Sequence, residues 1–347
     1  MPTSSPCPGR AGRAPVRLFT AGALGATLGG CRLVELAAEP AAPIEVTESG
    51  DGEPETNPEP PPLMGFWGLN GYVSPEGFAD VQQRFGINGF QVANEDPLWT
   101  VRFLLPMVRE AGMRVTLRLA GPHPAYTVDG DFSVERWKEQ LARWRRSGVQ
   151  EFIDDGTLAG HMMLDDITLF EGHDPDAADL EEMARYSKAL LPGLMTYVRQ
   201  KATQMPEPDG GCYLYVDACV NQYEAAEGSV ARYAREQAER AAQLDLGVIN
   251  GLNIADGGDG SAGRPGYRPD HYPMTAAEIT AYGSTLARVP ACGMFLNWEY
   301  DGEEAWSDGS IGATYFDQPD LQAALAALAA LYATHPPVTL LKPAEAR

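Results

Sequence analysis

The sequence predicts an α/β fold, a (β/α)8 TIM-type barrel, on three observations. From residue 63 to about residue 345, short apolar runs alternate with long amphipathic stretches, which is the pattern of βα units around a parallel sheet. Several of the apolar runs end in carboxylates, amides or aromatics, as barrel strands do at a catalytic face. With 347 residues, 44% of them hydrophobic, the chain is long enough for a barrel-sized core.

The expected elements follow the chain in order. The expected strands are 64–70, 87–93, 113–119, 160–166, 212–217, 247–254 and 292–298, and the expected helices are 75–85, 98–111, 133–147, 179–205, 229–244, 275–288 and 319–332. The strands are short apolar runs bounded by polar or turn residues. A complete barrel needs an eighth strand, which we expect in a weaker segment such as 149–153 or 338–341. The alternative is an incomplete or irregular barrel.

Helix boundaries rest on capping signals. Ser74-Pro75 predicts a helix start and Gly86 its stop. Thr275 and Glu278 have the spacing of a capping box. The 179–205 region is expected to bend at Pro192-Gly193.

Residues 1–30 have the layout of a secretory signal, with arginines before a modestly apolar run. The run ends in Leu28-Gly29-Gly30-Cys31, which resembles the bacterial lipoprotein box and implies cleavage before Cys31 and lipidation of its sulfur. An ordinary Sec signal with a coincidental cysteine is the alternative. The resemblance predicts an extracytoplasmic protein, lipid-anchored to a bacterial membrane at the cell surface or in the periplasm.

Residues 31–62 are expected to form a disordered tether between this anchor and a catalytic domain at 63–347. From Arg32 to Pro62 the chain has eight acids and seven prolines, a composition that cannot build a packed core. The formal charge of −22 repels phosphate backbones, so nucleic acid is excluded as a partner.

Three cysteines remain in the catalytic domain. Cys212, Cys219 and Cys292 lie in apolar runs, which favours buried free thiols; a Cys212–Cys292 bridge is the alternative. No CxxC or Cys/His spacing for zinc occurs, and no cofactor or metal is expected.

The strand ends carry the candidate site. The expected catalytic carboxylates are Asp166, Asp165, Glu299 and Asp217, and the expected substrate-binding residues are Trp67, Asn70, Glu95, Trp99, Arg118, Gln222, Tyr223, Asn253 and Trp298. Paired carboxylates provide the acid and the nucleophile or base of glycosidic cleavage. Adjacent strand residues point to opposite faces, so only one of Asp165 and Asp166 should point into the barrel, while the other orients Arg118 or caps a loop.

This layout resembles the glycoside hydrolase TIM-barrel superfamily. Residues 293–301, Gly-Met-Phe-Leu-Asn-Trp-Glu-Tyr-Asp, are similar to the last strand of chitinase-like barrels, where a Trp floors a sugar subsite. Met163-Leu-Asp-Asp166 is similar to strand-four ends of polysaccharide hydrolases. The DxxDxDxE signature of chitinases is absent, so no single family is assigned.

The resemblance implies a membrane-tethered glycoside hydrolase that cleaves a poly- or oligosaccharide. Its acid/base pair would join Asp166 or Asp165 to Glu299 or Asp217. The alternative is a non-catalytic carbohydrate-binding lipoprotein on the same scaffold. A third hypothesis is hydrolysis assisted by Mg²⁺ or Ca²⁺ bound at the acidic cluster.

Overall fold

The computed structural model describes residues 61–69, 73–266, 268, 270–289, 292–298, 315–335 and 341–342. The strands are β1 (Leu63–Trp67), β2 (Gly89–Ala93), β3 (Arg114–Arg118), β4 (Thr127–Val128), β5 (Asp131–Phe132), β6 (Leu158–Asp165), β7 (Met195–Arg199), β8 (Ala218–Tyr223), β9 (Gly247–Leu252) and β10 (Cys292–Asn297). The α-helices are α1 (Pro75–Phe85), α2 (Pro97–Trp99), α3 (Leu105–Glu110), α4 (Val134–Ala142), α5 (Gln150–Asp154), α6 (Ala177–Leu190), α7 (Val230–Gln243), α8 (Ala276–Ala287) and α10 (Pro319–Ala333). A π-helix joins α2 to α3 at Thr100–Leu104, and 3₁₀ turns lie at His123–Tyr126, Ala202–Gln204 and Ala225–Glu227.

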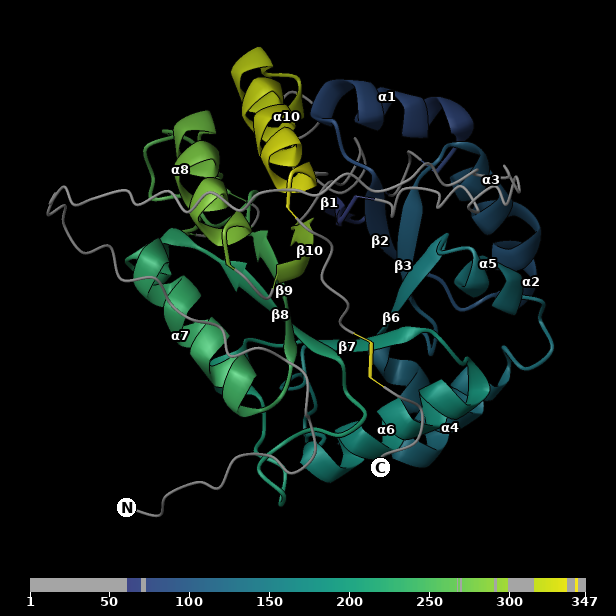
Figure 1. Ribbon diagram of the computed structural model, residues 1–347. Coiled ribbons are helices and arrows are strands. Elements are labelled where there is room, and N and C mark those ends of the chain that lie inside the picture. The colour runs from purple at the N-terminus through teal and green to yellow at the C-terminus, as the bar shows by residue number, and fades with distance from the viewer. Residues whose placement is uncertain are drawn as a thin grey trace, which may run out of the picture. The chain divides into compact units, whose positions relative to one another are not determined.

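Eight parallel strands close a barrel in the order β1, β10, β9, β8, β7, β6, β3 and β2, which confirms the predicted (β/α)8 class. Figure 1 shows the helices arranged outside this ring of strands. The remaining pair, β4 and β5, forms an antiparallel hairpin in the segment between β3 and α4. Among the described residues, none of the helices combines the length and apolarity that a membrane span requires.

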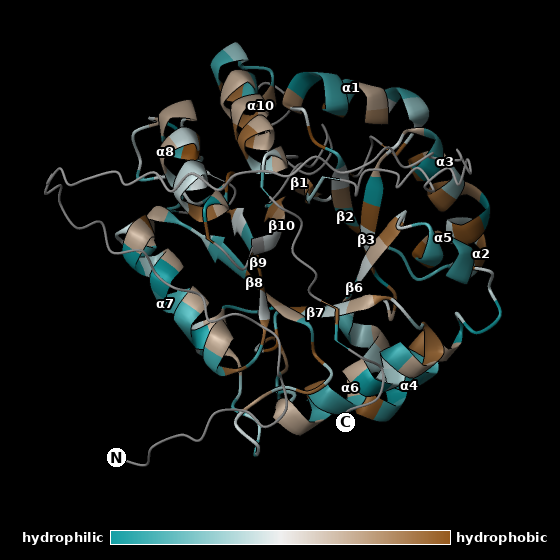
Figure 2. Cartoon of the chain, in the orientation of Figure 1, coloured by the Kyte–Doolittle hydropathy of each residue, from teal (hydrophilic) through white to brown (hydrophobic). Residues whose placement is uncertain are grey.

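Two apolar cores hold the barrel together. The first fills its interior with inward-facing strand residues, among them Trp67, Met162, Tyr197 and Leu296. The second lies between the strands and the surrounding helices. Figure 2 shows hydrophilic and hydrophobic residues interspersed along α7, as expected of a helix with one face on this second core.

The capping signals act as predicted. The Ser74 hydroxyl accepts from the Gly77 amide at the start of α1, and Gly86 ends that helix at φ 64°. Thr275 and Glu278 form a reciprocal capping box on α8.

Two expected elements are wrong. The region 179–205 is not one bent helix: α6 ends at Leu190, and the missing eighth strand, β7, follows Pro192-Gly193. Residues 212–217 are not a strand, because β8 begins only at Ala218. Neither place expected for the eighth strand holds it among the described residues: α5 covers most of 149–153, and 338–340 lie outside the described part.

The two cysteines whose side chains the structure describes differ in their state. Cys219 is a buried free thiol, as expected. Cys212 is disulfide-bonded, so the expectation of a free thiol there is wrong. The side chain of Cys292, the partner in the alternative of a bridge, lies outside the described residues. A cysteine near the protein surface is more accessible to oxidation than one enclosed in a core, and the Cys212 side chain lies outside the barrel strands.

Candidate functional site

A pocket of about 390 Å³ lies at the carboxyl ends of β6, β7 and β8. Its charged lining residues are Asp166, Arg199 and Lys201, and its amide lining residues are Gln200, Gln204 and Gln222. These residues follow or end β6, β7 and β8, which are neighbours in the barrel. Ligands of open and closed parallel α/β sheets bind at this end of the strands.

Asp165, the last residue of β6, lies between two arginines. Its Oδ2 is 3.2 Å from Nη1 of Arg118 on β3, and its Oδ1 is 2.5 Å from Nε of Arg199 on β7. The Arg199 guanidinium also lies over the indole of Trp67, with 5.5 Å between Cζ and the ring centroid. Asp165 therefore fixes two guanidinium groups across three strands, in agreement with the expectation that one aspartate orients Arg118.

Asp166 faces the pocket because the backbone turns there. Its φ of 62° is left-handed, a conformation that Asp and Asn tolerate better than other side chains. Its amide donates to the carbonyl of Arg199 at 3.1 Å, and its Oδ1 accepts from Thr168 Oγ1 at 2.9 Å. The turn separates the adjacent carboxylates: Asp165 contacts the arginines and Asp166 lines the pocket.

His123 and Tyr126 form an aromatic wall beside Asp165. The His123 ring packs 5.2 Å from Phe170 and 5.8 Å from Tyr126, measured between centroids. Burial lowers the pKa of His123, and the nearby Asp165 only partly opposes this shift. His123 Nε2 and the Tyr126 hydroxyl are buried without a hydrogen-bond partner among the described residues. A histidine with a lowered pKa thus lies beside Asp165, at a position that the sequence did not single out as a site residue.

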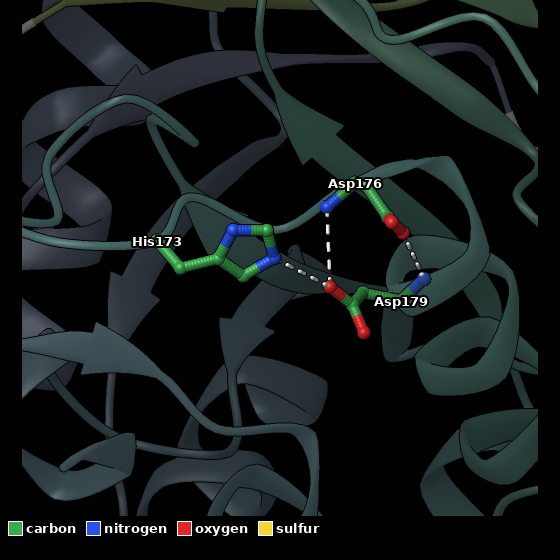
Figure 3. A group of neighbouring side chains, drawn as sticks. All are labelled: His173, Asp176 and Asp179. Atoms are coloured by element: carbon green, nitrogen blue, oxygen red, sulfur yellow. Dashed lines mark hydrogen bonds and ion pairs between the residues drawn. The ribbon is translucent and has the colours of Figure 1, made fainter.

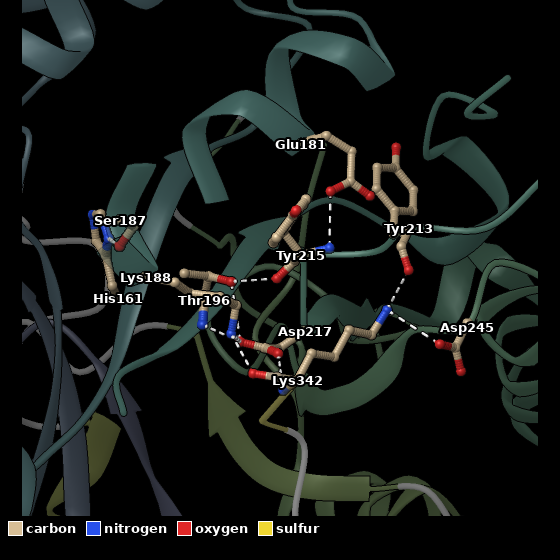
Figure 4. A network of polar contacts seen from close by, with 10 residues as sticks. All are labelled: His161, Glu181, Ser187, Lys188, Thr196, Tyr213, Tyr215, Asp217, Asp245 and Lys342. Atoms are coloured by element: carbon tan, nitrogen blue, oxygen red, sulfur yellow. Dashed lines mark hydrogen bonds and ion pairs between the residues drawn. The ribbon is translucent and has the colours of Figure 1, made fainter. Parts of the chain in front are cut away.

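Asp217 does not lie at the mouth, so its expected position is wrong. It directly precedes β8 and is fully buried at the opposite end of the barrel, in the network shown in Figure 4. Its Oδ2 is 2.7 Å from Lys188 Nζ and accepts from the Thr196 amide, while its Oδ1 accepts from the Lys342 amide. The run before Asp217 reads as a strand because it is apolar, but it packs as a loop. Asp217 is therefore a structural residue and cannot pair with Asp166 across the mouth.

Tyr223 is also misplaced as a substrate-binding residue. It is buried in the outer core, with ring centroids 5.2 Å from Tyr233 of α7 and 5.0 Å from Tyr282 of α8. Its hydroxyl donates to the carbonyl of Gly228. Strand alternation explains this, because Gln222 points inward and the next residue must point outward.

The other expected residues divide by position. Trp67, Arg118 and Gln222 lie at or beside the pocket. Asn253 and Trp298 form an isolated bridge just beyond β9 and β10. By contrast, Glu95 pairs loosely with Arg143 at 3.9 Å, and Trp99 is exposed on α2. Asn70, Glu299 and Cys31 lie outside the described residues.

Six residues of the pocket lining escaped the sequence prediction. Two of them are Thr168 and Val220, and the other four are Arg199, Gln200, Lys201 and Gln204, whose segment was assigned to a helix. The signal was present: Met195-Thr-Tyr-Val198 is rich in strand-forming residues directly after Pro192-Gly193. Glu224, just after β8, was missed as well. Its Oε2 lies 3.4 Å from Asn253 Nδ2 and 3.6 Å from Arg268 Nη2.

One group of described side chains has ligand atoms spaced for a metal ion: His173, Asp176 and Asp179. Figure 3 shows that the two aspartates cap α6 reciprocally, each accepting a hydrogen bond from the other's amide. His173 Nε2 lies 3.9 Å from Asp179 Oδ2. Capping the helix accounts for these carboxylates without an ion.

The closed ring of eight parallel strands defines a TIM-type barrel. No protein-family model matches the chain, and no curated protein matches it. Among solved structures, GH10 from Paenibacillus barcinonensis is similar at 12% identity and a TM-score of 0.50, over 78% of this chain and 95% of that one.

Two further structures are similar. Gas2p of Saccharomyces cerevisiae, in complex with laminaritriose and laminaritetraose, has 14% identity and a TM-score of 0.48 over 80% of this chain. The catalytic domain of the major endoglucanase from Xanthomonas campestris pv. campestris has 12% identity and a TM-score of 0.45, over 77% of this chain and 95% of that one. The chain spans 66% of that Gas2p chain and 62% of the chain in a Gas2p apostructure, which is less than two thirds of each. At these identities the likeness concerns the fold alone, and no single family is assigned.

Proposed function

We propose that this protein is a glycoside hydrolase that cleaves a poly- or oligosaccharide at the pocket beyond β6, β7 and β8. The observation that carries the proposal is the placement of Asp166, whose carboxylate lines that pocket beside glutamine amides. Carboxylates perform acid/base or nucleophilic work at a glycosidic bond, and amides bind sugar hydroxyls. The similarity of the fold to GH10 agrees with this reading.

The roles of the two aspartates differ. Asp166 supplies one reacting carboxylate, while Asp165 positions Arg118 and Arg199 and does not touch the reacting atoms. Glu299 remains our candidate for the second carboxylate, since it follows Trp298 at the carboxyl end of β10. A raised pKa in the less polar of the two environments would define the acid.

The test is cleavage of a polysaccharide panel by the full-length protein and by Asp166→Asn. Asparagine tolerates the left-handed backbone and keeps the oxygen that faces Thr168, so the loop should persist. We expect a loss of cleavage of at least about 100-fold with binding retained, because general acid–base or covalent catalysis contributes on this order. Asp129→Asn is the matched control, since Asp129 is exposed and also left-handed, at φ 52°.

An unchanged rate in Asp166→Asn would exclude Asp166 as a reacting group. Binding without cleavage anywhere on the panel would instead favour a carbohydrate-binding lipoprotein. Loss of cleavage in a chelator, with recovery on adding Mg²⁺ or Ca²⁺, would favour the metal-assisted mechanism.

We also propose that the protein is extracytoplasmic, with residues 1–30 as a lipoprotein signal, Cys31 as the lipid site, 31–62 as tether and 63–347 as catalytic domain. The disulfide at Cys212 agrees with this, because disulfides persist in oxidising compartments. Labelling of cells with a radioactive fatty acid should mark the parent protein and not Cys31→Ala. Equal labelling of both would leave the lipid site without support.

A further inference from the structure

The pocket is more positive than the rest of the chain. The whole sequence has 48 acidic residues against 26 basic ones. In the pocket lining this ratio is reversed, since Arg199 and Lys201 face a single carboxylate, that of Asp166. Because clustered charge of one sign raises the local concentration of the opposite sign, this reversal favours an anionic ligand.

The ion pairs at the mouth leave Arg199 and Lys201 in the lining of the pocket. Arg118 and Arg199 share the carboxylate of Asp165, and Asp166 adds a second carboxylate at the pocket. Lys201 has its own partner, Glu227, but both side chains remain partly exposed. The Arg199 guanidinium is held by Asp165 and Trp67 and lines the pocket at the same time.

The barrel interior next to Arg199 contains buried donors without acceptors among the described residues. Trp67 Nε1 and Gln91 Nε2 belong to side chains only 4% exposed and have no hydrogen-bond partner among the described residues. The two residues are neighbours in the pairing of β1 with β2. Arg118 Nε and Gln222 Nε2 are also buried atoms without a hydrogen-bond partner among the described residues, although their side chains are partly exposed. Such orphaned donors are rare in native proteins and call for an explanation, such as a ligand that accepts.

The indole and the guanidinium can only donate hydrogen bonds. A neutral sugar offers hydroxyls, which must donate as well as accept, whereas a carboxylate offers acceptors alone and matches a guanidinium in two-point geometry. We propose that the sugar bound in this pocket is a uronic acid, with its carboxylate received by Arg199 and Lys201. The substrate class is therefore an acidic polysaccharide, an inference that rests on the proposed function.

The test compares each acidic polymer with its own neutral ester. Full-length protein is titrated with oligomers of polygalacturonate, alginate and a glucuronan, and with the methyl esters of each, by calorimetry at low and high salt. We expect at least one acid to bind about tenfold or more tightly than its ester, with affinity falling as salt rises.

Substitutions test whether Arg199 and Lys201 bind the carboxylate of the sugar. Arg199→Gln and Lys201→Gln should each weaken binding of the acid about tenfold and leave the ester unchanged, and Arg199→Lys should restore part of the loss. Arg136→Gln is the control, because Arg136 is exposed on α4 and pairs with Glu139. Thermal unfolding of each variant shows that it is folded.

The outcomes separate this inference from the proposed function. Cleavage of neutral glycans, with no preference for any acid, would overturn the inference and leave the hydrolase intact. Preferential binding of an acidic oligosaccharide without its cleavage would support the inference and contradict the proposed hydrolase function. Equal affinity for acid and ester would also overturn the inference, whatever the cleavage result.

Discussion

His161 is a histidine that the fold keeps uncharged. It is fully buried on β6, stacked on Trp137 at 5.6 Å, with Nδ1 2.9 Å from the Ser187 hydroxyl. Burial lowers its pKa to about 3. Between pH 6.5 and 3 the unfolded chain binds a proton at this position that the folded chain does not, so stability falls as the pH falls through this window.

We therefore expect the free energy of unfolding to lose about 2 kcal/mol between pH 7 and pH 5 on account of His161 alone. Urea unfolding at several pH values, compared between the parent and His161→Gln, isolates this contribution. The variant should show a shallower slope below pH 6.5, and His173→Gln, at an exposed histidine, should keep the parent slope. Identical slopes in all three proteins would contradict the assignment.

Asp217 neutralises a buried lysine. Both Lys188 and Asp217 are almost completely inaccessible, and removing one partner of a buried pair leaves an uncompensated charge. Asp217→Asn should lower the free energy of unfolding by about 3–5 kcal/mol. Asp209→Asn, on the exposed loop before the same strand, should change it by less than about 0.5 kcal/mol. Urea denaturation measures both, and equal effects would mean that the pair contributes little.

At the scale of elements, the capping box of α8 provides a quantitative check. Thr275 Oγ1 accepts from the Glu278 amide, and the Glu278 carboxylate accepts from the Thr275 amide. Thr275→Ala should cost about 1 kcal/mol of stability. Thr280→Ala, the same change in the exposed middle of the helix, should stay within about 0.5 kcal/mol. A Thr280 effect as large as that of Thr275 would show that the box is not the cause.

Capping and periodicity made most elements predictable, whereas two boundaries were not. Pro192-Gly193 was interpreted as a bend, because a long helical pattern surrounds it, although it ends α6 and opens β7. The apolar run before Asp217 has strand composition, but only backbone pairing decides whether such a run joins the sheet.

Those two errors determined what the sequence could say about the site. Asp165, Asp166 and Arg118 were predictable, since each lies at the end of a correctly placed strand. Gln222 was also expected at the site, although its strand was placed too early in the chain. Arg199 was not predictable, because its strand was missed. The ion pair between Arg199 and Asp165 was therefore missed as well. Tyr223 shows the remaining limit: one residue of register moves a side chain from the pocket to the outer core.

At the scale of the molecule, residues close to the C-terminus hold together the amino-terminal end of the barrel. The Lys342 amide donates to Asp217, its carbonyl accepts from Lys188 Nζ at 3.1 Å, and its own Nζ donates to the Tyr213 carbonyl at 2.7 Å. These contacts join a terminal segment to the segments around α6 and β8 (Figure 4).

Removal of residues 341–347 should therefore lower the melting temperature by about 10 °C, as expected for a loss of several kcal/mol in a domain of this size. Removal of 343–347 spares these contacts and serves as the matched control. Calorimetry or circular dichroism measures both truncations. A similar melting temperature for the two would show that Lys342 adds little.

The burial of Lys188 and Lys342 also determines which lysine side chains react with amine-specific reagents in the folded protein. The sequence has only four lysines, the others being Lys138 and Lys201, which are partly exposed. An acylating reagent should modify Lys138 and Lys201 in the native protein and reach Lys188 and Lys342 only after unfolding. Peptide mass spectrometry after a short labelling pulse would then show, from the modification of Lys188 and Lys342, whether the amino-terminal end of the barrel is folded. Protection of Lys201 from the reagent would show that the pocket is occupied.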